Sequence, residues 1–186
     1  APYKEDASVA PMGIYGQSKL AGEQQLQIEN PKHIILRTSW VFSAHGNNFV
    51  KTMLRVGATR DELGVVGDQF GCPTFAGDIA EAISAFIATL QNDKQFVAWG
   101  IYNCSNRGDC SWYDFAQAIF NAGVQSGLLA TAPQVNSITT DQYPTPTARP
   151  AYSVLNCSKL EMQLGQLMPH WKIGLSQVCT VLKQRQ

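Results

Sequence analysis

The sequence lacks an excess of charge of either sign and also lacks a long hydrophobic run. Its 186 residues contain 14 Lys and Arg against 14 Asp and Glu, so there is no net positive field to attract a phosphate backbone or an anionic lipid. The most apolar stretches, residues 79–90 and 96–102, are shorter or more interrupted than the run of about 20 residues that a bilayer helix needs. We therefore expect no nucleic-acid partner and no membrane partner. The 45% hydrophobic content suits a packed core of one domain or slightly more.

Cysteine and histidine are few, and their spacing matches no metal or redox motif. The five cysteines form no C-x-x-C pair, and the three histidines lie far apart. No basic and then apolar leader opens the chain, so we expect a reducing cytoplasm and no metal site. The alternative is a secreted glycoprotein, and it rests on two N-x-S sequons at Asn103 and Asn156, a motif that often arises by chance.

The sequence also lacks the glycine-rich turn that binds a dinucleotide between a strand and a helix. Residues 64–71 contain glycines, but their spacing is not G-x-G-x-x-G, and Cys72-Pro73 follows where a helix should continue. We expect residues 67–74 to form a loop on the substrate side instead.

Hydrophobic periodicity predicts helices that alternate with strands. The expected helices cover residues 12–28, 49–58, 78–90, 111–122, 158–164 and 174–182, with Asp78 and an S-x-x-D motif at Ser111 as start signals. The expected strands cover residues 33–42, 63–66, 101–104 and 134–138. The continuous apolar start of residues 33–42 is typical of a buried strand in a parallel sheet. Three prolines predict an extended loop over residues 143–150.

Tyr15 and Lys19 are four residues apart in the first expected helix and should therefore be neighbours on one helix face. A free phenol, with a pKa near 10, is a poor acid at neutral pH, and a neighbouring cation lowers that pKa by stabilising the phenolate. A tyrosine in this setting can act as a proton donor. The alternative is an ordinary helix surface, because Y-x-x-x-K alone is a common pattern.

The segment from Tyr15 to Glu23 resembles the catalytic helix of the extended short-chain dehydrogenase/reductase family. Further motifs resemble, in the same order, the dTDP-4-dehydrorhamnose reductase branch of that family, so that the resemblance covers nearly the whole chain. They are Pro2-Tyr3 with Glu5 and Asp6, residues 36–42, residues 46–50, Asp68-Gln69 with Gly71, Pro73 and Thr74, residues 100–102, Ser111-Trp112-Tyr113 with Phe115 and Ala116, and residues 143–150.

This resemblance implies an α/β fold: the C-terminal part of a Rossmann-type parallel sheet with the catalytic helix, plus a smaller α/β substrate-binding domain. Residues 1–45 would end the NAD(P)-binding Rossmann domain. Residues 46–186 would form mainly the nucleotide-sugar domain, with some strands and helices returning to the sheet. The dinucleotide fingerprint and the family's catalytic Ser or Thr would lie upstream of Ala1. We therefore expect about 120 further residues there, as several βα units of about 30 residues, and no activity from the fragment alone.

The resemblance also implies a reaction. Tyr15 would donate a proton to the C4 ketone oxygen of dTDP-4-dehydro-L-rhamnose while NADPH, or NADH, delivers a hydride, which yields dTDP-L-rhamnose for surface polysaccharide. Lys19 would hydrogen-bond the nicotinamide ribose and favour the tyrosinate. A dTDP-sugar is the expected partner and a homodimer the expected assembly. The sequence carries no signal for Mg²⁺.

Six residues are candidates for binding the nucleotide sugar. Trp40 follows a predicted buried strand, where open α/β sheets bind ligands, and it matches the family's aromatic that packs against the sugar. Five polar residues are expected around the nucleotide diphosphate, and these are Asn47, Asn48, Gln69, Thr74 and Arg149. The alternatives are core packing for the tryptophan, turn chemistry for the asparagines, loop hydrogen bonds for Gln69 and Thr74, and an ion pair for the arginine. Trp112 and Tyr113 are interpreted as structural, packing under a helix.

Two other functions are compatible with the same residues. The chain could belong to a non-catalytic module of this fold that binds a nucleotide sugar or a partner enzyme, as the regulatory subunit of methionine adenosyltransferase does. It could also belong to a related reductase or epimerase that acts on another nucleotide sugar. The intact Tyr15 and Lys19 pair favours catalysis.

Overall fold

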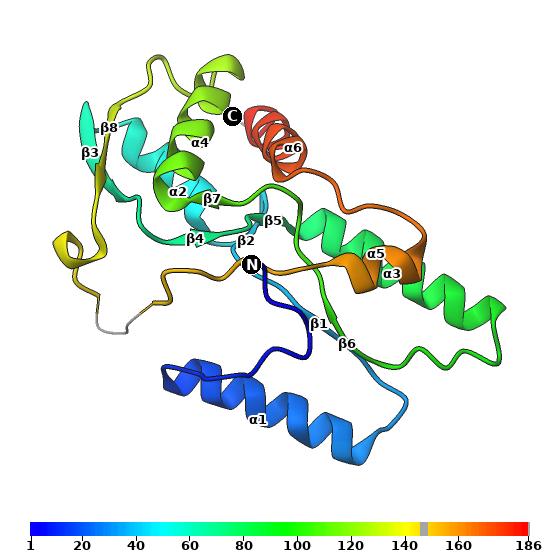
Figure 1. The fold of residues 1–186 in the computed structure, drawn as a ribbon. Helices are drawn as coiled ribbons and strands as arrows, with labels where there is room; N and C mark the ends of the chain where they lie inside the picture. Colours follow the sequence, from blue (N-terminus) through cyan, green and yellow to red (C-terminus); the bar gives the residue numbers. More distant parts are fainter. Residues whose placement is uncertain (146–148, 186) are drawn as a thin grey trace.

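The computed structural model describes residues 1–145 and 149–185 (Figure 1). Its helices are α1 (Ile14–Glu29), α2 (Phe49–Gly57), α3 (Ala76–Asn92), α4 (Trp112–Gln125), the short 3₁₀ helix η1 (Thr140–Gln142), α5 (Ser158–Leu164) and α6 (Trp171–Lys183). Its strands are β1 (Ile34–Arg37), β2 (Val41–Phe42), β3 (Glu62–Val66), β4 (Phe70–Gly71), β5 (Thr74–Phe75), β6 (Gly100–Asn103), β7 (Cys110–Ser111) and β8 (Gln134–Ile138).

The strands pair in short ribbons. β1 pairs with β6, β2 with β5, and β3 with β8, all in parallel, whereas β4 and β7 are antiparallel. Parallel strands must be joined by crossover connections, and helices supply several of them here. In Figure 1, α1 lies on one side of the β1–β6 pair, and α3 and α5 lie on the other. The predicted α/β class is confirmed.

The larger core packs α2, α4 and α6 together. Phe115 of α4 is fully buried, and its ring lies 5.5 Å from the ring of Phe42, 5.5 Å from that of Phe49 and 5.2 Å from that of Trp171. The start of α4 is fixed by the predicted S-x-x-D motif, because Ser111 and Asp114 form a reciprocal capping box. A smaller core lies beside the β1–β6 pair. Its buried members are Ala82, Phe86, Phe96, Tyr102, Cys104, Leu160 and Met168.

The prediction of one strand over residues 33–42 is wrong, because Trp40 interrupts it. Trp40 has a φ of 46°, in the left-handed region that a bulky side chain rarely adopts. The chain therefore changes direction after β1, and Val41 pairs with Thr74 instead of continuing along β6. The Trp40 carbonyl accepts a hydrogen bond from the Thr74 N–H at 3.1 Å, and this bond helps to hold the unusual conformation.

Two further local predictions need correction. Asp78 does not cap a helix: α3 begins at Ala76, and Asp78 is buried in its first turn, where it accepts a 2.6 Å hydrogen bond from Asn106 Nδ2. The segment 67–74, expected to be a loop, contains β4 and the first residue of β5. Both errors arise from long-range pairing, which outweighs local sequence preference.

Alkaline pH should destabilise the fold through its buried thiols. The five cysteines are free, and burial raises the pKa from 9.0 to about 11 for Cys72 and to about 12 for Cys104 and Cys110. The unfolded chain then loses thiol protons at a lower pH than the folded chain does. The contribution of these thiols to the free energy of unfolding is complete below pH 9 and is lost as the pH rises toward 12. The loss is about 1.4 kcal/mol per pH unit for each thiol that is deprotonated only in the unfolded chain.

The measurement is the free energy of unfolding in urea of the full-length protein between neutral and strongly alkaline pH. A Cys104→Ala variant is the control. Its free energy of unfolding should be lower at neutral pH, but that energy should fall less steeply with pH above pH 9. An unchanged slope in that variant would contradict the assignment.

Candidate active site

Tyr15 and Lys19 lie in the first turns of α1, on an exposed face of the helix. The Lys19 Nζ atom is 5.4 Å from the centroid of the Tyr15 ring, so the two side chains are the neighbours that their spacing predicts. The Tyr15 side chain is 77% exposed, and α1 has no buried residue. Within the described residues, the phenol is therefore not used for packing.

An ion pair connects α1 to the end of β1. Arg37 Nη2 lies 2.7 Å from Glu23 Oε2, and Arg37 Nη1 donates to the backbone carbonyl of Glu5 at 3.1 Å. The hydrogen-bonded Glu23 carboxylate raises the pKa of Arg37 above its usual value. Within the described residues α1 buries none of its own side chains, and this pair links the helix to β1. No role was predicted for Glu23 or Arg37, because nothing near either residue in the sequence marks it as a partner of the other.

A cavity of about 270 Å³ lies next to this ion pair. Lys19, Glu23 and Arg37 line it together with Val9, Ala10, Pro11, Gly16 and Leu20. The Lys19 ammonium thus borders a concave surface on α1.

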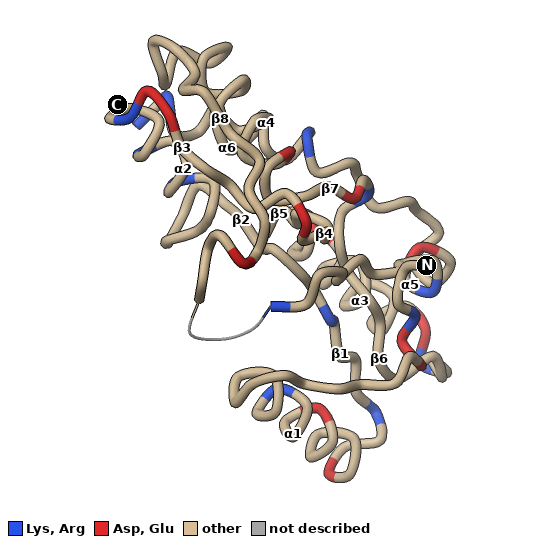
Figure 2. Tube along the Cα trace, turned by 60° about the vertical axis from the view of Figure 1, so that its left-hand side comes forward, with Lys and Arg blue, Asp and Glu red and all other residues tan. Residues whose placement is uncertain are grey.

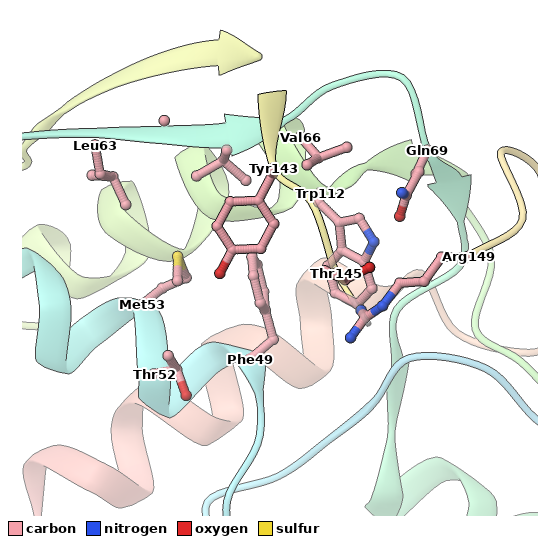
Figure 3. A pocket seen from close by; sticks show the side chains of 12 residues that line it. Phe49, Thr52, Met53, Leu63, Val66, Gln69, Trp112, Tyr143, Thr145 and Arg149 are labelled. Carbon is pink, nitrogen blue, oxygen red and sulfur yellow. The ribbon is translucent and has the colours of Figure 1, made fainter. Parts of the chain in front are cut away.

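A separate cavity of about 260 Å³ lies between α2, β3 and the start of α4 (Figure 3). Its lining residues are Phe49, Thr52, Met53, Leu63, Gly64, Val65, Val66, Gln69, Trp112, Tyr143, Thr145 and Arg149. Figure 3 shows Gln69 and Arg149 at one end and Met53 and Leu63 at the other. Aromatic and aliphatic walls with a guanidinium at one end suit a flat ring that carries a negative group.

Trp40 lies behind this cavity and supports its wall. Its ring stacks on that of Trp112, with centroids 3.5 Å apart and planes at 10°. Gly71 permits this position, because a Cβ at residue 71 would approach the Trp40 ring to 2.5 Å. Trp40 therefore acts on the cavity through Trp112, and its direct contact with a sugar stays a prediction.

The structure brings two of the five polar candidates together and leaves three outside the cavity lining. Gln69 and Arg149 both line the cavity. Asn47 is exposed in the turn before α2, and Asn48 caps that helix by accepting a hydrogen bond from the Lys51 N–H. Thr74 is fully buried and donates to the Cys72 carbonyl at 3.3 Å. Residues 146–148 of the expected 143–150 loop lie outside the described residues.

The start of α1 and the segment that carries Tyr143 and Arg149 lie on the same side of the molecule. Figure 1 and Figure 2, which are turned by 60° from each other, agree on this placement.

The RmlD substrate binding domain family matches residues 1–184. The chain belongs to this family. It is 46% identical to the dTDP-4-dehydrorhamnose reductase of Aggregatibacter actinomycetemcomitans over 176 residues. This match covers 95% of this chain and 60% of that protein. It is 43% identical to the protein of the same name from Sinorhizobium fredii over 171 residues. This match covers 92% of this chain and 57% of that protein. The chain thus spans roughly three-fifths of the length of these relatives.

Solved structures of RmlD relatives confirm the fold. The chain resembles a dTDP-4-dehydrorhamnose reductase from Clostridium acetobutylicum with a TM-score of 0.86 and 38% identity, over 98% of this chain and 60% of that one. It also resembles the Bacillus anthracis protein of the same name, in complex with NADP, with a TM-score of 0.84 and 38% identity over 95% of this chain and 58% of that one. The predicted family resemblance is confirmed.

Much of the cavity lining of this RmlD chain was not predicted from the sequence. Trp112, interpreted as purely structural, also lines the cavity, and so do Phe49, Met53 and Tyr143. Phe49 and Met53 are four residues apart in α2, and this spacing was the only local signal. Within the described residues, no helix is long and apolar enough to cross a membrane, and no three His, Cys, Asp or Glu side chains gather as a metal site.

Proposed function

We propose that the whole protein reduces the C4 ketone of dTDP-4-dehydro-L-rhamnose with NADPH and forms dTDP-L-rhamnose. One observation supports this most: Tyr15 and Lys19 are neighbours on α1, in a chain that also has an aromatic cavity lined by Arg149. The chain that carries them is 46% identical over 176 residues to a protein named for this reaction.

The residues of α1 fit the nicotinamide end of the cofactor. Lys19 is on an exposed helix face and borders a cavity, so its ammonium group is available to donate to ribose hydroxyls. The related Bacillus anthracis structure is in complex with NADP. When bound, NADPH supplies the hydride that the ketone carbon receives.

Tyr15 supplies the proton in this proposal. As the ketone carbon is reduced, negative charge develops on its oxygen, and the Tyr15 hydroxyl donates its proton to that oxygen. The neighbouring Lys19 ammonium stabilises the phenolate that remains. The Arg37–Glu23 pair keeps α1, and with it the phenol, in place.

We assign the nucleotide sugar to the cavity between α2, β3 and the start of α4. The guanidinium of Arg149 pairs with the diphosphate, and the rings of Phe49, Trp112 and Tyr143 pack against the base and sugar. Trp40 and Asn47 lie outside the cavity lining, and their contact with the sugar stays a prediction. Asn48 and Thr74 contribute through the fold: Asn48 by capping α2, and Thr74 by its place in β5.

The proposed domain division follows from the same assignment. Residues 1–45 end a Rossmann domain, and residues 46–186 form mainly the nucleotide-sugar domain. The strand β6 and the helices α3 and α5 return from the second part to pack beside β1, around the smaller core.

The test is an assay of the purified full-length protein with NADPH and dTDP-4-dehydro-L-rhamnose. We expect equimolar NADPH oxidation and dTDP-L-rhamnose formation, with weaker turnover of the UDP and GDP counterparts. Binding of dTDP without any turnover would contradict the proposal and favour a non-catalytic binding module. A preference for a UDP-sugar would instead favour a related nucleotide-sugar enzyme.

A further inference from the structure

A hydrogen-bonded chain of three side chains ends in the cavity between α2, β3 and the start of α4. The Thr140 hydroxyl is 2.7 Å from Asp68 Oδ1, and Gln69 Nε2 is 3.0 Å from the Thr140 Oγ1 atom. The Thr140 backbone N–H also donates to the Asp68 carboxylate at 3.0 Å. The parallel pairing of β3 with β8 brings these residues together, because Asp68 and Gln69 follow β3 and Thr140 follows β8.

Proton counting fixes the direction of this chain. The hydrogen bonds from Thr140 lower the pKa of the exposed Asp68, so its carboxylate is ionised at neutral pH and only accepts hydrogen bonds. The single hydroxyl hydrogen of Thr140 therefore points to Asp68. Thr140 Oγ1 is then left as an acceptor, and only the NH₂ group of Gln69 can donate to it.

The orientation of the Gln69 amide follows from this count. Its Nε2 atom faces Thr140, so its Oε1 atom must face the other way. The side chain is only 6% exposed and lines the cavity, and Figure 3 shows its oxygen directed toward Trp112 and Arg149. No hydrogen bond from residues 1–145 or 149–185 reaches this oxygen. A buried amide is thus held with its acceptor toward the ligand space.

We propose that Asp68 and Thr140 are positioning residues that hold Gln69 Oε1 as an acceptor for a hydrogen-bond donor of the substrate's nucleoside. The proposal rests on the proposed function and refines it. The donor is the imide N–H of thymine or the 3′-hydroxyl of deoxyribose, which share this chemistry. The diphosphate, around which we had expected Gln69 to lie, is a poor partner, because its oxygens are also acceptors.

The deciding variant is Asp68→Asn in the full-length protein. The new amide donates to Thr140 Oγ1, which releases the hydroxyl to donate to Gln69 Oε1. The Gln69 amide then turns, and an N–H donor faces the donor group of the ligand. We expect the affinity for dTDP to fall about tenfold or more. Thr140→Val removes the hydroxyl that links Asp68 to Gln69 and should also weaken dTDP binding. Thr140→Ser keeps a hydroxyl and should bind dTDP as the wild type does.

The measurement is titration calorimetry with dTDP, dCDP and 2′,3′-dideoxythymidine diphosphate, after thermal unfolding has shown that each variant is folded. For the wild type, weak dCDP binding identifies the imide N–H as the donor, and weak binding of the dideoxy analogue identifies the 3′-hydroxyl. Whichever of the two analogues binds the wild type weakly, its difference in affinity from dTDP should shrink or reverse in Asp68→Asn. Asp141→Asn is the matched control, because it also removes one carboxylate charge, at the residue after Thr140 in η1, and changes none of the three hydrogen-bonded side chains.

Unchanged dTDP affinity in both Asp68→Asn and Thr140→Val would overturn the proposal. Tighter dTDP binding by Asp68→Asn than by Asp141→Asn would overturn it too, because Gln69 would then be serving the phosphates. If the wild type turns over the dTDP-sugar and the Asp68 and Thr140 variants bind normally, only this inference fails. If the Asp68 and Thr140 variants bind dTDP more weakly but the wild type shows no turnover, only the reductase proposal fails. A wild type that does not bind dTDP contradicts both proposals.

Discussion

Replacing Tyr15 by Phe in the full-length protein should lower the rate of NADPH-dependent ketone reduction by about a hundred- to ten-thousandfold, because the proton donor is lost. Binding should be little affected. Tyr15 does not line the cavity to which dTDP is assigned, so loss of its hydroxyl removes none of the groups proposed to hold dTDP. Single-turnover rates with saturating NADPH, together with dTDP titration, would separate the two effects.

Tyr3→Phe is the matched control for this experiment. Tyr3 is also exposed, at 47%, and its ring packs against that of Tyr152 instead of facing Lys19. We expect this variant to retain wild-type turnover. Near-normal turnover by Tyr15→Phe would remove the phenol from the mechanism. A parallel loss of dTDP affinity in Tyr15→Phe would show that the hydroxyl has a binding role.

Features that depend on neighbours in the sequence were predictable. The helix α1 and the adjacency of Tyr15 and Lys19 follow from helical spacing, and the capping box at Ser111 follows from a four-residue motif. The helix α5 was expected over residues 158–164 and is found as Ser158–Leu164. In each case the stabilising contacts lie within one or two turns of helix, so a short window of sequence contains them.

Features that depend on distant partners were not predictable. The turn at Trp40 requires the Thr74 N–H and the ring of Trp112, which come from other elements. The link from Asp68 to Thr140 joins residues 72 positions apart, and nothing near either residue indicates it. Sequence therefore located the neighbouring Tyr15 and Lys19, but only the pairing of β3 with β8 reveals how Gln69 is oriented.

Truncation of Phe115 should have the largest effect on stability. Phe115 is fully buried and contacts the rings of Phe42, Phe49 and Trp171, so Phe115→Ala leaves a cavity at the centre of the larger core. We expect the free energy of unfolding of the full-length protein in urea to fall by about 3–5 kcal/mol. Phe115→Leu, which keeps most of the volume, should cost less than about 1.5 kcal/mol.

The same substitution should reach the nucleotide cavity, because the core and the cavity share a wall. The ring of Phe49 lies 5.5 Å from that of Phe115 and 4.6 Å from that of Trp112, and both Phe49 and Trp112 line the cavity. Under conditions where Phe115→Ala is still folded, its dTDP affinity should therefore be lower than that of Phe115→Leu. Equal affinities would mean that α2 and α4 hold these rings in place without Phe115. The first residues of the two helices, Phe49 and Trp112, would then determine the shape of the cavity by themselves.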